Sequence, residues 1–362
     1  MSLMEGPPGA VTTIDGKKCV YFGGTGYYGL QGHPDLIRAG VEAFRAFGLH
    51  GATSRAGFGN NPVLAAVEAR LREFFGTAEA AYFGSGYLSP LILARALADD
   101  FDVIFMDEAA HVAVADSAAS MKKPLVLFRH RDPEDLRRKL KAGLRPGRRP
   151  AVFTDGVFPV YGRLAPVRDY AEALAPYGGL MAVDDAHGAG VLGPNGRGVT
   201  EHFGLRPGAA HVAGTLSKAF GGHGGFIIGG KRLIARVRMQ GAYLGSTPAP
   251  TPAAAASAKG LEIVGSRPGL REKLRQNAAL VKTGLRRLGL DTDDTVVPIA
   301  AWSLRTESAM KSVQRALFDE GIALPHLKYP GTPARGVLRV SVFSTHTEEQ
   351  IERLLDALRR AL

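Results

Sequence analysis

The amino-acid sequence predicts an α/β protein with a mainly parallel, buried sheet, followed by a smaller α+β domain. Short apolar runs alternate with amphipathic segments of helical length, which is the pattern of βαβ units. Glycine is abundant, with 46 of the 362 residues, and favours many tight turns between strands and helices. Hydrophobic residues make up 45% of the chain and charged residues 22%, which is typical of a globular protein with a sizeable core.

The helices are predicted where apolar residues recur at helical spacing. They run from Pro34 to Phe47, Pro62 to Phe75, Asp132 to Lys141, Val167 to Leu174, Pro268 to Leu288, Glu307 to Glu320 and Thr347 to Leu362. The last of them starts with a capping-box pattern, Thr347-Glu348-Glu349-Gln350. The strands are predicted from the apolar runs between helices. They run from Ala80 to Phe83, Val103 to Met106, Leu125 to Phe128, Ala151 to Thr154, Gly179 to Val183, His211 to Ala213 and Gly225 to Ile228.

The pattern divides the chain into three regions. Residues 1–48 form an amino-terminal arm with a short strand, and residues 49–248 form the large α/β domain that holds the sheet. Residues 249–362 form the small α+β domain, because two strand-like runs, Val296 to Leu304 and Val337 to Phe343, lie among its helices.

Composition and charge exclude several classes of protein. The chain has no run of about 18 uncharged apolar residues, so we expect no transmembrane helix. Its start lacks a basic stretch with an apolar segment, and its single cysteine, Cys19, fits a reducing compartment, so we expect a cytoplasmic location. The net charge of +11 suits anionic ligands or reflects solvated, arginine-rich helix faces; no nucleic-acid motif accompanies it, so we expect no nucleic-acid partner.

Reactive side chains follow two of the predicted strands. Open α/β sheets bind ligands at the carboxyl ends of their strands. Asp184, Asp185 and His187 follow one strand directly, and Lys218 follows another inside a glycine-rich, nearly uncharged segment. Burial without a partner would lower the pKa of this lysine, which suits Schiff-base chemistry.

Two more strand ends add a phosphate site and a second histidine. The run from Gly84 to Tyr87 is a glycine turn at a helix start, which offers free backbone N–H groups to a phosphate. Thr215 and Ser217 add hydroxyl groups beside the lysine. His111 follows a further strand, where it is either functional or a satisfied polar residue. Together these groups suit a cofactor with a phosphate, a ring nitrogen and an aldehyde, whose ring acts as an electron sink when a carboxylate keeps its nitrogen protonated.

These residues lie in longer runs that resemble the α-oxoamine synthases, which are pyridoxal-phosphate enzymes of aminotransferase fold type I. The matching runs are Gly51 to Arg55, Phe83 to Tyr87, Thr154 to Phe158, Val183 to Gly188, Gly193 to Gly198, Gly214 to Lys218, and Leu338 to Ser341 with His346-Thr347. The resemblance implies pyridoxal 5'-phosphate as the cofactor. It also implies a PLP-dependent transferase fold type I, with a mainly parallel seven-stranded sheet that carries helices on both faces.

The resemblance implies a role in the cofactor chemistry for four residues. Lys218 forms the internal aldimine and moves protons at the substrate Cα. Asp184 pairs with the pyridine nitrogen, and His187 contacts the phenolic oxygen of the ring. His111 stacks on the ring face.

The resemblance also implies the residues that hold the phosphate and the substrate. The phosphate contacts come from Ser85, Gly86, Tyr87 and Thr215. Ser246 or Thr247 reaches the phosphate of the partner subunit, which implies a homodimer with composite active sites. Arg339 holds the substrate carboxylate, the alternative being a buried structural salt bridge. The resemblance implies no metal site.

Two departures from the family pattern affect the substrate site. Thr25 stands where the family usually has asparagine near the substrate carboxylate, and Pro159 stands where it usually has serine. We therefore expect a PLP-dependent acyltransferase that condenses a small amino acid with an acyl-CoA or acyl carrier protein thioester to an α-oxoamine, usually with decarboxylation. An aminotransferase or aldolase-type activity on the same cofactor is the alternative, and a catalytically silent cofactor-binding protein is a third.

Overall fold

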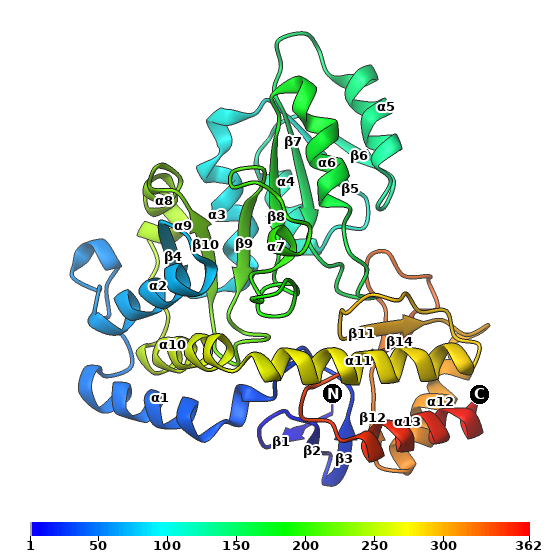
Figure 1. Ribbon diagram of the computed structural model, residues 1–362. Coiled ribbons are helices and arrows are strands. Elements are labelled where there is room, and N and C mark those ends of the chain that lie inside the picture. Colours follow the sequence, from blue (N-terminus) through cyan, green and yellow to red (C-terminus); the bar gives the residue numbers. More distant parts are fainter. Residues whose placement is uncertain (1) are drawn as a thin grey trace.

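A seven-stranded sheet forms the centre of the larger domain in the computed structural model, which describes residues 2–362 (Figure 1). Its strands are β4 (Glu79–Phe83), β5 (Val103–Asp107), β6 (Leu125–Phe128), β7 (Pro150–Asp155), β8 (Leu180–Asp184), β9 (His211–Thr215) and β10 (Gly225–Gly229). The strand order is β4-β10-β9-β8-β7-β5-β6. Strands β5 to β9 pair in parallel, whereas β10 runs antiparallel to both β4 and β9. The structure therefore confirms every strand predicted for this sheet, and its mainly parallel character.

Helices cover both faces of this sheet. They are α2 (Pro62–Phe75), α3 (Ser89–Ala96), α4 (Val112–Ser120), α5 (Pro133–Gly143), α6 (Val167–Leu174), α7 (Val199–His202), α8 (Lys231–Arg238) and α9 (Gly241–Leu244). Alternate strand residues pack into two separate cores, since successive side chains of a strand point to opposite faces. Phe105 and Val152 lie in one core with α2, α5 and α6, and Ile104 and Phe153 lie in the other with α3, α4 and α8.

The helical periodicity of apolar residues did not reveal α3, α4, α7, α8 or α9, although the glycine turn from Gly84 to Tyr87 predicted a helix start just before α3. Helix α3 is buried on nearly every side, because six of its eight residues are inaccessible to solvent. Such a helix has no polar face and therefore no amphipathic period to detect. Five 3-10 turns were also not predicted, because each has only three residues and is too short to show a period. They are Leu30–Gly32, Arg55–Gly57, Gly86–Leu88, Ala98–Asp100 and Ala175–Tyr177.

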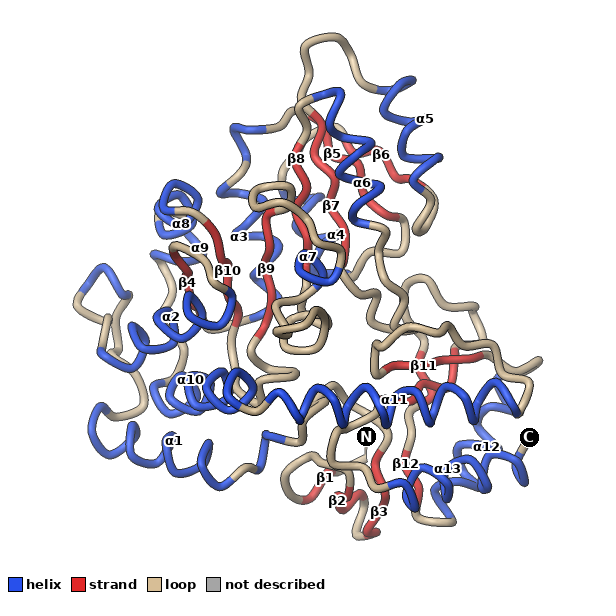
Figure 2. The backbone as a smooth tube through the Cα atoms, viewed as in Figure 1, coloured by secondary structure: helices blue, strands red, loops and turns tan. Residues whose placement is uncertain are grey.

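The smaller domain contains a three-stranded sheet of β11 (Ile299–Trp302), β14 (Val337–Ser341) and β13 (His326–Leu327). Helices α11 (Pro268–Arg287), α12 (Glu307–Asp319) and α13 (Glu348–Ala361) accompany it (Figure 2). The predicted capping box of the last helix is present, with Thr347 and Gln350 each accepting from the other's backbone N–H.

The amino-terminal arm has more strands than the one expected from the sequence. It forms β1 (Met4–Glu5), β2 (Val11–Ile14) and β3 (Lys17–Tyr21). Strand β3 pairs in parallel with β12 (Ile322–Ala323) of the smaller domain. Its helix α1 (Pro34–Phe47) packs along α10 (Thr251–Ser266). Strands β1 and β12 have only two residues each, and β12 pairs with the distant β3, so no local pattern marks them.

Helix α11 contributes to two hydrophobic cores. Leu274 in its first half packs into the larger core, and Val281 and Leu285 in its second half pack into that of the smaller domain. Helix α10 also packs into the larger core through Ala254 and Leu261, so the domain boundary at residue 249 stays a prediction.

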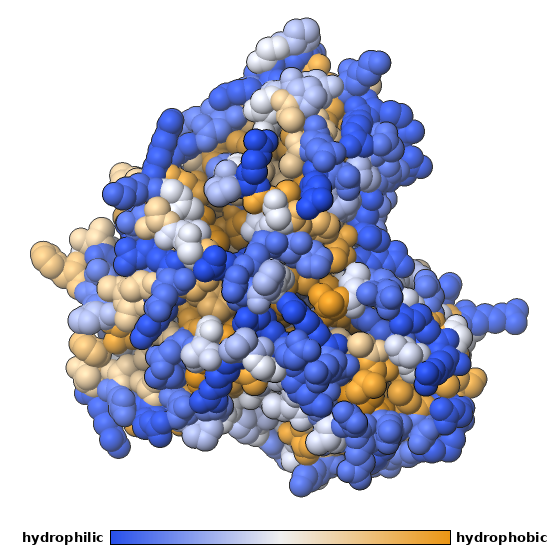
Figure 3. Space-filling model, viewed as in Figure 1, coloured by the Kyte–Doolittle hydropathy of each residue, from blue (hydrophilic) through white to orange (hydrophobic). Residues whose placement is uncertain are grey.

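No helix among residues 2–362 is long and apolar enough to cross a membrane. On the face drawn in Figure 3, hydrophilic residues cover most of the surface, and hydrophobic residues are visible in the central recess, at the left edge and in a patch at the lower right.

Candidate active site

The carboxyl ends of β8 and β9 bring together a buried carboxylate and an amine. Asp184 is buried, and its Oδ1 accepts a hydrogen bond from Ala186 N at 3.1 Å. Lys218 Nζ makes no hydrogen bond and no ion pair within 4.0 Å to any other residue that the structure describes. Burial lowers the pKa of Lys218 to about 8, although the charges of Asp184 and Asp155 oppose the shift. The lysine is therefore far more nucleophilic at neutral pH than a solvated one.

His111 is held against the same site as a neutral ring. Its backbone N–H donates to Asp155 Oδ2 at 2.7 Å, and its Nδ1 accepts from Ala113 N at 3.1 Å, which caps α4. Burial and the nearby positive charge of Lys218 lower the pKa of His111 to about 4. Because Nδ1 accepts, the ring proton resides on Nε2 at neutral pH.

Asp155 is a functional candidate that the sequence reasoning missed. It is buried at the carboxyl end of β7, and burial together with the charge of Asp184 raises its pKa well above the usual range. Asp155 directly follows the predicted strand from Ala151 to Thr154. This position could have indicated a functional residue, because Asp184 and Lys218 were predicted from their positions after strands.

His187 is also buried and neutral. Burial, together with the charges of Lys218 and Arg339, lowers its pKa well below the usual range. Its Nδ1 lies 2.6 Å from the hydroxyl oxygen of Tyr27. Burial raises the pKa of Tyr27, so this phenol stays protonated and donates to Nδ1. The proton on His187 then resides on Nε2 and is free for another acceptor.

The 3-10 turn Gly86–Leu88, directly before α3, approaches β9 so closely that no side chain fits at Gly86. A Cβ on Gly86 would lie 2.5 Å from Thr215 Oγ1, which is itself fixed by donation to Gly224 O at 2.8 Å. The backbone N–H groups of Gly86 and Tyr87 open a helical segment, where no intrahelical acceptor is available. The predicted phosphate residues Ser85, Gly86 and Thr215 are therefore close together, with unoccupied donors.

Arg339 is a buried cation held by neutral groups. Its Nε donates to Pro159 O at 2.9 Å, and its Nη1 donates to Ser341 Oγ at 2.6 Å and to Gly24 O at 3.2 Å. No carboxylate lies within 4.0 Å of it among residues 2–362, so the alternative of a structural salt bridge is wrong. A buried charge without a counter-ion is unfavourable unless a ligand supplies one.

Thr25 follows the residue whose carbonyl binds this arginine, and Ser341 is a further contact of the arginine that the sequence did not indicate. Thr25 is half-buried next to Gly24, whose carbonyl accepts from both Arg339 and Ser341 Oγ. The proline that replaces the family's serine contributes its carbonyl oxygen, which orients Arg339. Ser341 belongs to the run Leu338 to Ser341, in which the family resemblance implied substrate binding for Arg339 alone.

The predicted residues Tyr87, Ser246 and Thr247 are on the surface of the single chain. Tyr87 is exposed, and its hydroxyl donates to Asp116. Ser246 Oγ donates to Ala242 O at 2.9 Å within its own segment. Thr247 is exposed as well. Ser246 and Thr247 are therefore both exposed in the single chain, and the hydroxyl of Ser246 is hydrogen-bonded within its own segment.

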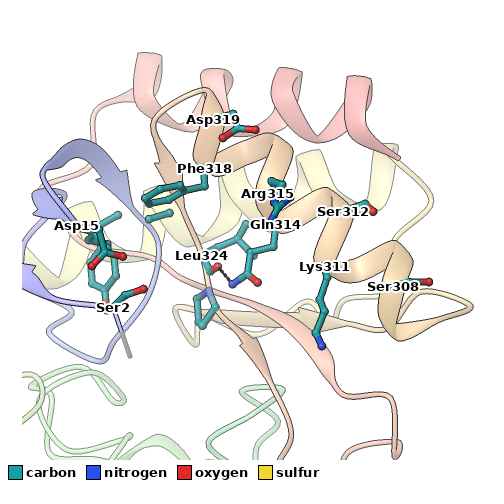
Figure 4. A pocket seen from close by; sticks show the side chains of 14 residues that line it. Ser2, Asp15, Ser308, Lys311, Ser312, Gln314, Arg315, Phe318, Asp319 and Leu324 are labelled. Carbon is teal, nitrogen blue, oxygen red and sulfur yellow. Dashed lines mark hydrogen bonds between the residues drawn. The ribbon is translucent and has the colours of Figure 1, made fainter.

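A cavity of about 890 Å³ lies elsewhere, between the amino-terminal strands and α12 (Figure 4). Its lining includes Asp15, Lys311 and Arg315, and Gln314 Nε2 donates to Leu324 O at 2.9 Å on its floor. None of the predicted site residues lines it. Cavity size alone therefore does not locate the chemistry of this protein.

The site residues fit pyridoxal phosphate. Among residues 2–362 they include a buried amine without a partner, a buried carboxylate, two neutral histidines and a glycine turn with free N–H donors. Each functional part of that cofactor therefore has a group that can bind it. Fold and site together define a pyridoxal-phosphate enzyme of fold type I, and pyridoxal 5'-phosphate is its cofactor.

Comparisons with known proteins agree with this class. The sequence model of the family "Aminotransferase class I and II" matches residues 17–358. The chain is 33% identical over 362 residues to 8-amino-7-oxononanoate synthase of Thermoanaerobacter pseudethanolicus, covering 99% of this chain and 92% of that protein. It is 34% identical over 364 residues to the enzyme of that name from Geobacter sulfurreducens, with coverage of 99% and 92%.

Solved structures are similar over the whole chain. Serine palmitoyltransferase from S. paucimobilis with a bound PLP–myriocin aldimine superposes with a TM-score of 0.94 at 30% identity, covering 100% of this chain and 92% of that one. The chain therefore belongs to the aminotransferase class I and II family and, within it, to the α-oxoamine synthases. It is a PLP-dependent acyltransferase of the α-oxoamine synthase type.

Proposed function

We propose that this protein condenses a small amino acid with an acyl thioester, carried by coenzyme A or an acyl carrier protein, and that Lys218 and Arg339 are central to this reaction. The observation that supports the proposal most strongly is a buried amine and a buried guanidinium in one site, neither of which has a carboxylate within 4.0 Å among residues 2–362. The positive charge of Arg339 contributes to the low pKa of Lys218, so the two groups are electrostatically close. The first suits a cofactor aldehyde and the second suits a substrate carboxylate.

Pyridoxal phosphate, when bound, withdraws electrons from the bonds at the substrate Cα. Lys218 would hold the cofactor and then move the proton at that carbon. Asp184 would keep the pyridine nitrogen protonated, and the Nε2 proton of His187 would be donated to the phenolic oxygen. His111 would cover the face of the cofactor ring. Because its imidazole is neutral, it would not repel the ammonium group of an incoming amino acid.

Arg339 would bind the amino-acid carboxylate. Its Nε and Nη1 donate to carbonyl and hydroxyl acceptors, and the guanidinium also interacts with the hydroxyl of Tyr27, so that none of its partners is a carboxylate among the described residues. Thr25 would line the same site beside Gly24. We propose that the substrate is a small amino acid, because the similar solved structure is a serine palmitoyltransferase and members of the family use small amino acids.

We also propose a homodimer with composite sites in the cytoplasm. Ser246 and Thr247 are exposed after α9, where they would reach the phosphate in the partner subunit. The cytoplasmic assignment is supported by the single cysteine, Cys19, which is buried and unpaired.

The proposed reaction is tested by mixing the holoenzyme with single amino acids, with and without acyl-CoA. We expect a long-wavelength visible absorbance band with a small amino acid, and release of a free thiol only when both substrates are present. Arg339→Gln provides the matched control, which should lose the amino-acid response while retaining the cofactor. Amino-group transfer to a 2-oxo acid without thiol release would instead identify an aminotransferase.

A further inference from the structure

A second cavity, of about 790 Å³, lies directly beside the candidate active site, between the two domains. Pro159 lines it and also presents its carbonyl to Arg339, so one residue separates the cavity from the proposed carboxylate site. Trp302 of β11 and the loop from Pro330 to Pro333 form the opposite wall. The volume is that of a typical small-molecule site and exceeds what a small amino acid fills.

The lining of this cavity combines aromatic rings with an unpaired arginine. The guanidinium of Arg163 lies over the ring of Tyr161, 5.1 Å from its centroid. It has no carboxylate within 4.0 Å and no side-chain hydrogen bond among residues 2–362. Phe158 and Trp302 add apolar surface. This arrangement suits an anionic group attached to an apolar chain.

The surrounding charges leave the cavity positive. Arg335 stands at the rim, where its Nε donates to Ser303 Oγ at 2.9 Å, and it also lacks a carboxylate partner in the described chain. Burial raises the pKa of Tyr161 while Arg163 and Arg335 both act to lower it, so both cations lie near one ring. His130 is bonded to Asp107 at 2.9 Å. Asp291 is the one acidic residue in the lining, and it is exposed.

We propose that this cavity binds an anionic group of the acyl thioester and that Arg163 is its principal ligand. The inference rests on the proposed function, since it names the site of the second substrate. A phosphate on the pantetheine arm and a carboxylate at the end of the acyl chain offer the same chemistry, an oxyanion that accepts two hydrogen bonds from one guanidinium. The apolar chain attached to either group would lie along Phe158 and Trp302.

Steady-state kinetics of Arg163→Gln test the proposal. The half-exposed side chain makes no hydrogen bond or ion pair with residues 2–362 and contacts only the face of Tyr161, so the variant should fold normally. We expect the KM for the thioester to rise about ten- to a hundredfold, as for a lost charge-assisted hydrogen bond, with little change in the KM for the amino acid. Arg163→Lys should recover part of the loss. Arg206→Gln, at an exposed arginine without an ion pair in a distant loop, is the matched control and should behave as the wild type.

Four thioesters distinguish the two sources of the anion: octanoyl-CoA, glutaryl-CoA and the N-acetylcysteamine thioesters of the same acids. A phosphate ligand predicts a loss with both coenzyme A thioesters and none with the others. A carboxylate ligand predicts a loss with both glutaryl thioesters only. If Arg163→Gln leaves the KM unchanged for all four, the proposal is wrong.

Fluorescence separates failure of this inference from failure of the proposed function. Trp302 is the single tryptophan of the chain and lines the cavity, so its emission reports on occupancy without turnover. We expect saturable changes with free coenzyme A or glutarate that are weakened in Arg163→Gln. An enzyme that turns over no thioester yet shows this response would refute the proposed reaction alone, and a wild-type enzyme whose emission responds to neither probe would refute the cavity assignment.

Discussion

The low pKa of Lys218 makes a quantitative prediction about cofactor capture. An amine must be neutral to attack an aldehyde, and burial lowers the pKa of Lys218 to about 8 from 10.5. At pH 7 about one such amine in ten is neutral, against about one in three thousand for an unperturbed lysine, a gain of about 300-fold. The rate of cofactor capture by the apoenzyme should therefore rise about tenfold per pH unit below pH 8 and level off above it.

Two variants should move the midpoint of this pH profile in opposite directions. The carboxylate of Asp184 raises the pKa of Lys218, so Asp184→Asn should shift the midpoint to lower pH. The guanidinium of Arg339 lowers the same pKa, so Arg339→Gln should shift it to higher pH. The midpoint is the informative quantity, since both substitutions can also change the limiting rate.

Stopped-flow absorbance of the apoenzyme mixed with pyridoxal phosphate measures the profile, and borohydride reduction followed by peptide mapping identifies the lysine. A midpoint near pH 10, or a label on any lysine other than Lys218, would refute the reasoning. Shifts of the same sign in both variants would show that charge does not control this amine.

Three further predictions concern the ligand contacts. Arg339→Ala should raise the apparent amino-acid Kd about ten- to a hundredfold with the cofactor retained, because a charge-assisted bond contributes about 1.5–3 kcal/mol; an unchanged Kd in a spectral titration would make Arg339 structural. Gly86→Ala should weaken cofactor binding in equilibrium dialysis, because its Cβ would lie 2.5 Å from Thr215 Oγ1, whereas Gly143→Ala, which has open space, should not. The protein should sediment as a dimer, and Thr247→Glu should lower cofactor affinity by repelling the partner's phosphate; a monomer that binds the cofactor fully would contradict this.

The sequence predicted the framework of the fold because its signals are local. Each strand of the large sheet is a short apolar run, and the long surface helices show a clear apolar stripe, as in α13. Helix α3 shows no such stripe, because it is buried on nearly every side, and only the glycine turn before it indicated where it starts. Strand β12 was not predicted, because it consists of two residues paired with a distant strand.

The candidate site was predictable where residues follow strands, as Lys218 and Asp184 do. Their partners were not, because those contacts join distant parts of the chain. Tyr27 and His187 are 160 positions apart, and Arg339 and Gly24 are 315 apart. Nothing local in the sequence indicates that a proline carbonyl orients the arginine.

Helix α11 links the two domains mechanically. Its 20 residues extend about 30 Å, with one end embedded in each hydrophobic core. Asn277, near its middle, donates from Nδ2 to the carbonyls of Phe343 and His346, a few residues after Arg339. Unfolding either domain would therefore strip half of this helix of its packing, which couples the two into one cooperative unit. Because it packs into both cores, the same helix fixes the position of the smaller domain, which carries Arg339, relative to the larger domain, which carries Lys218.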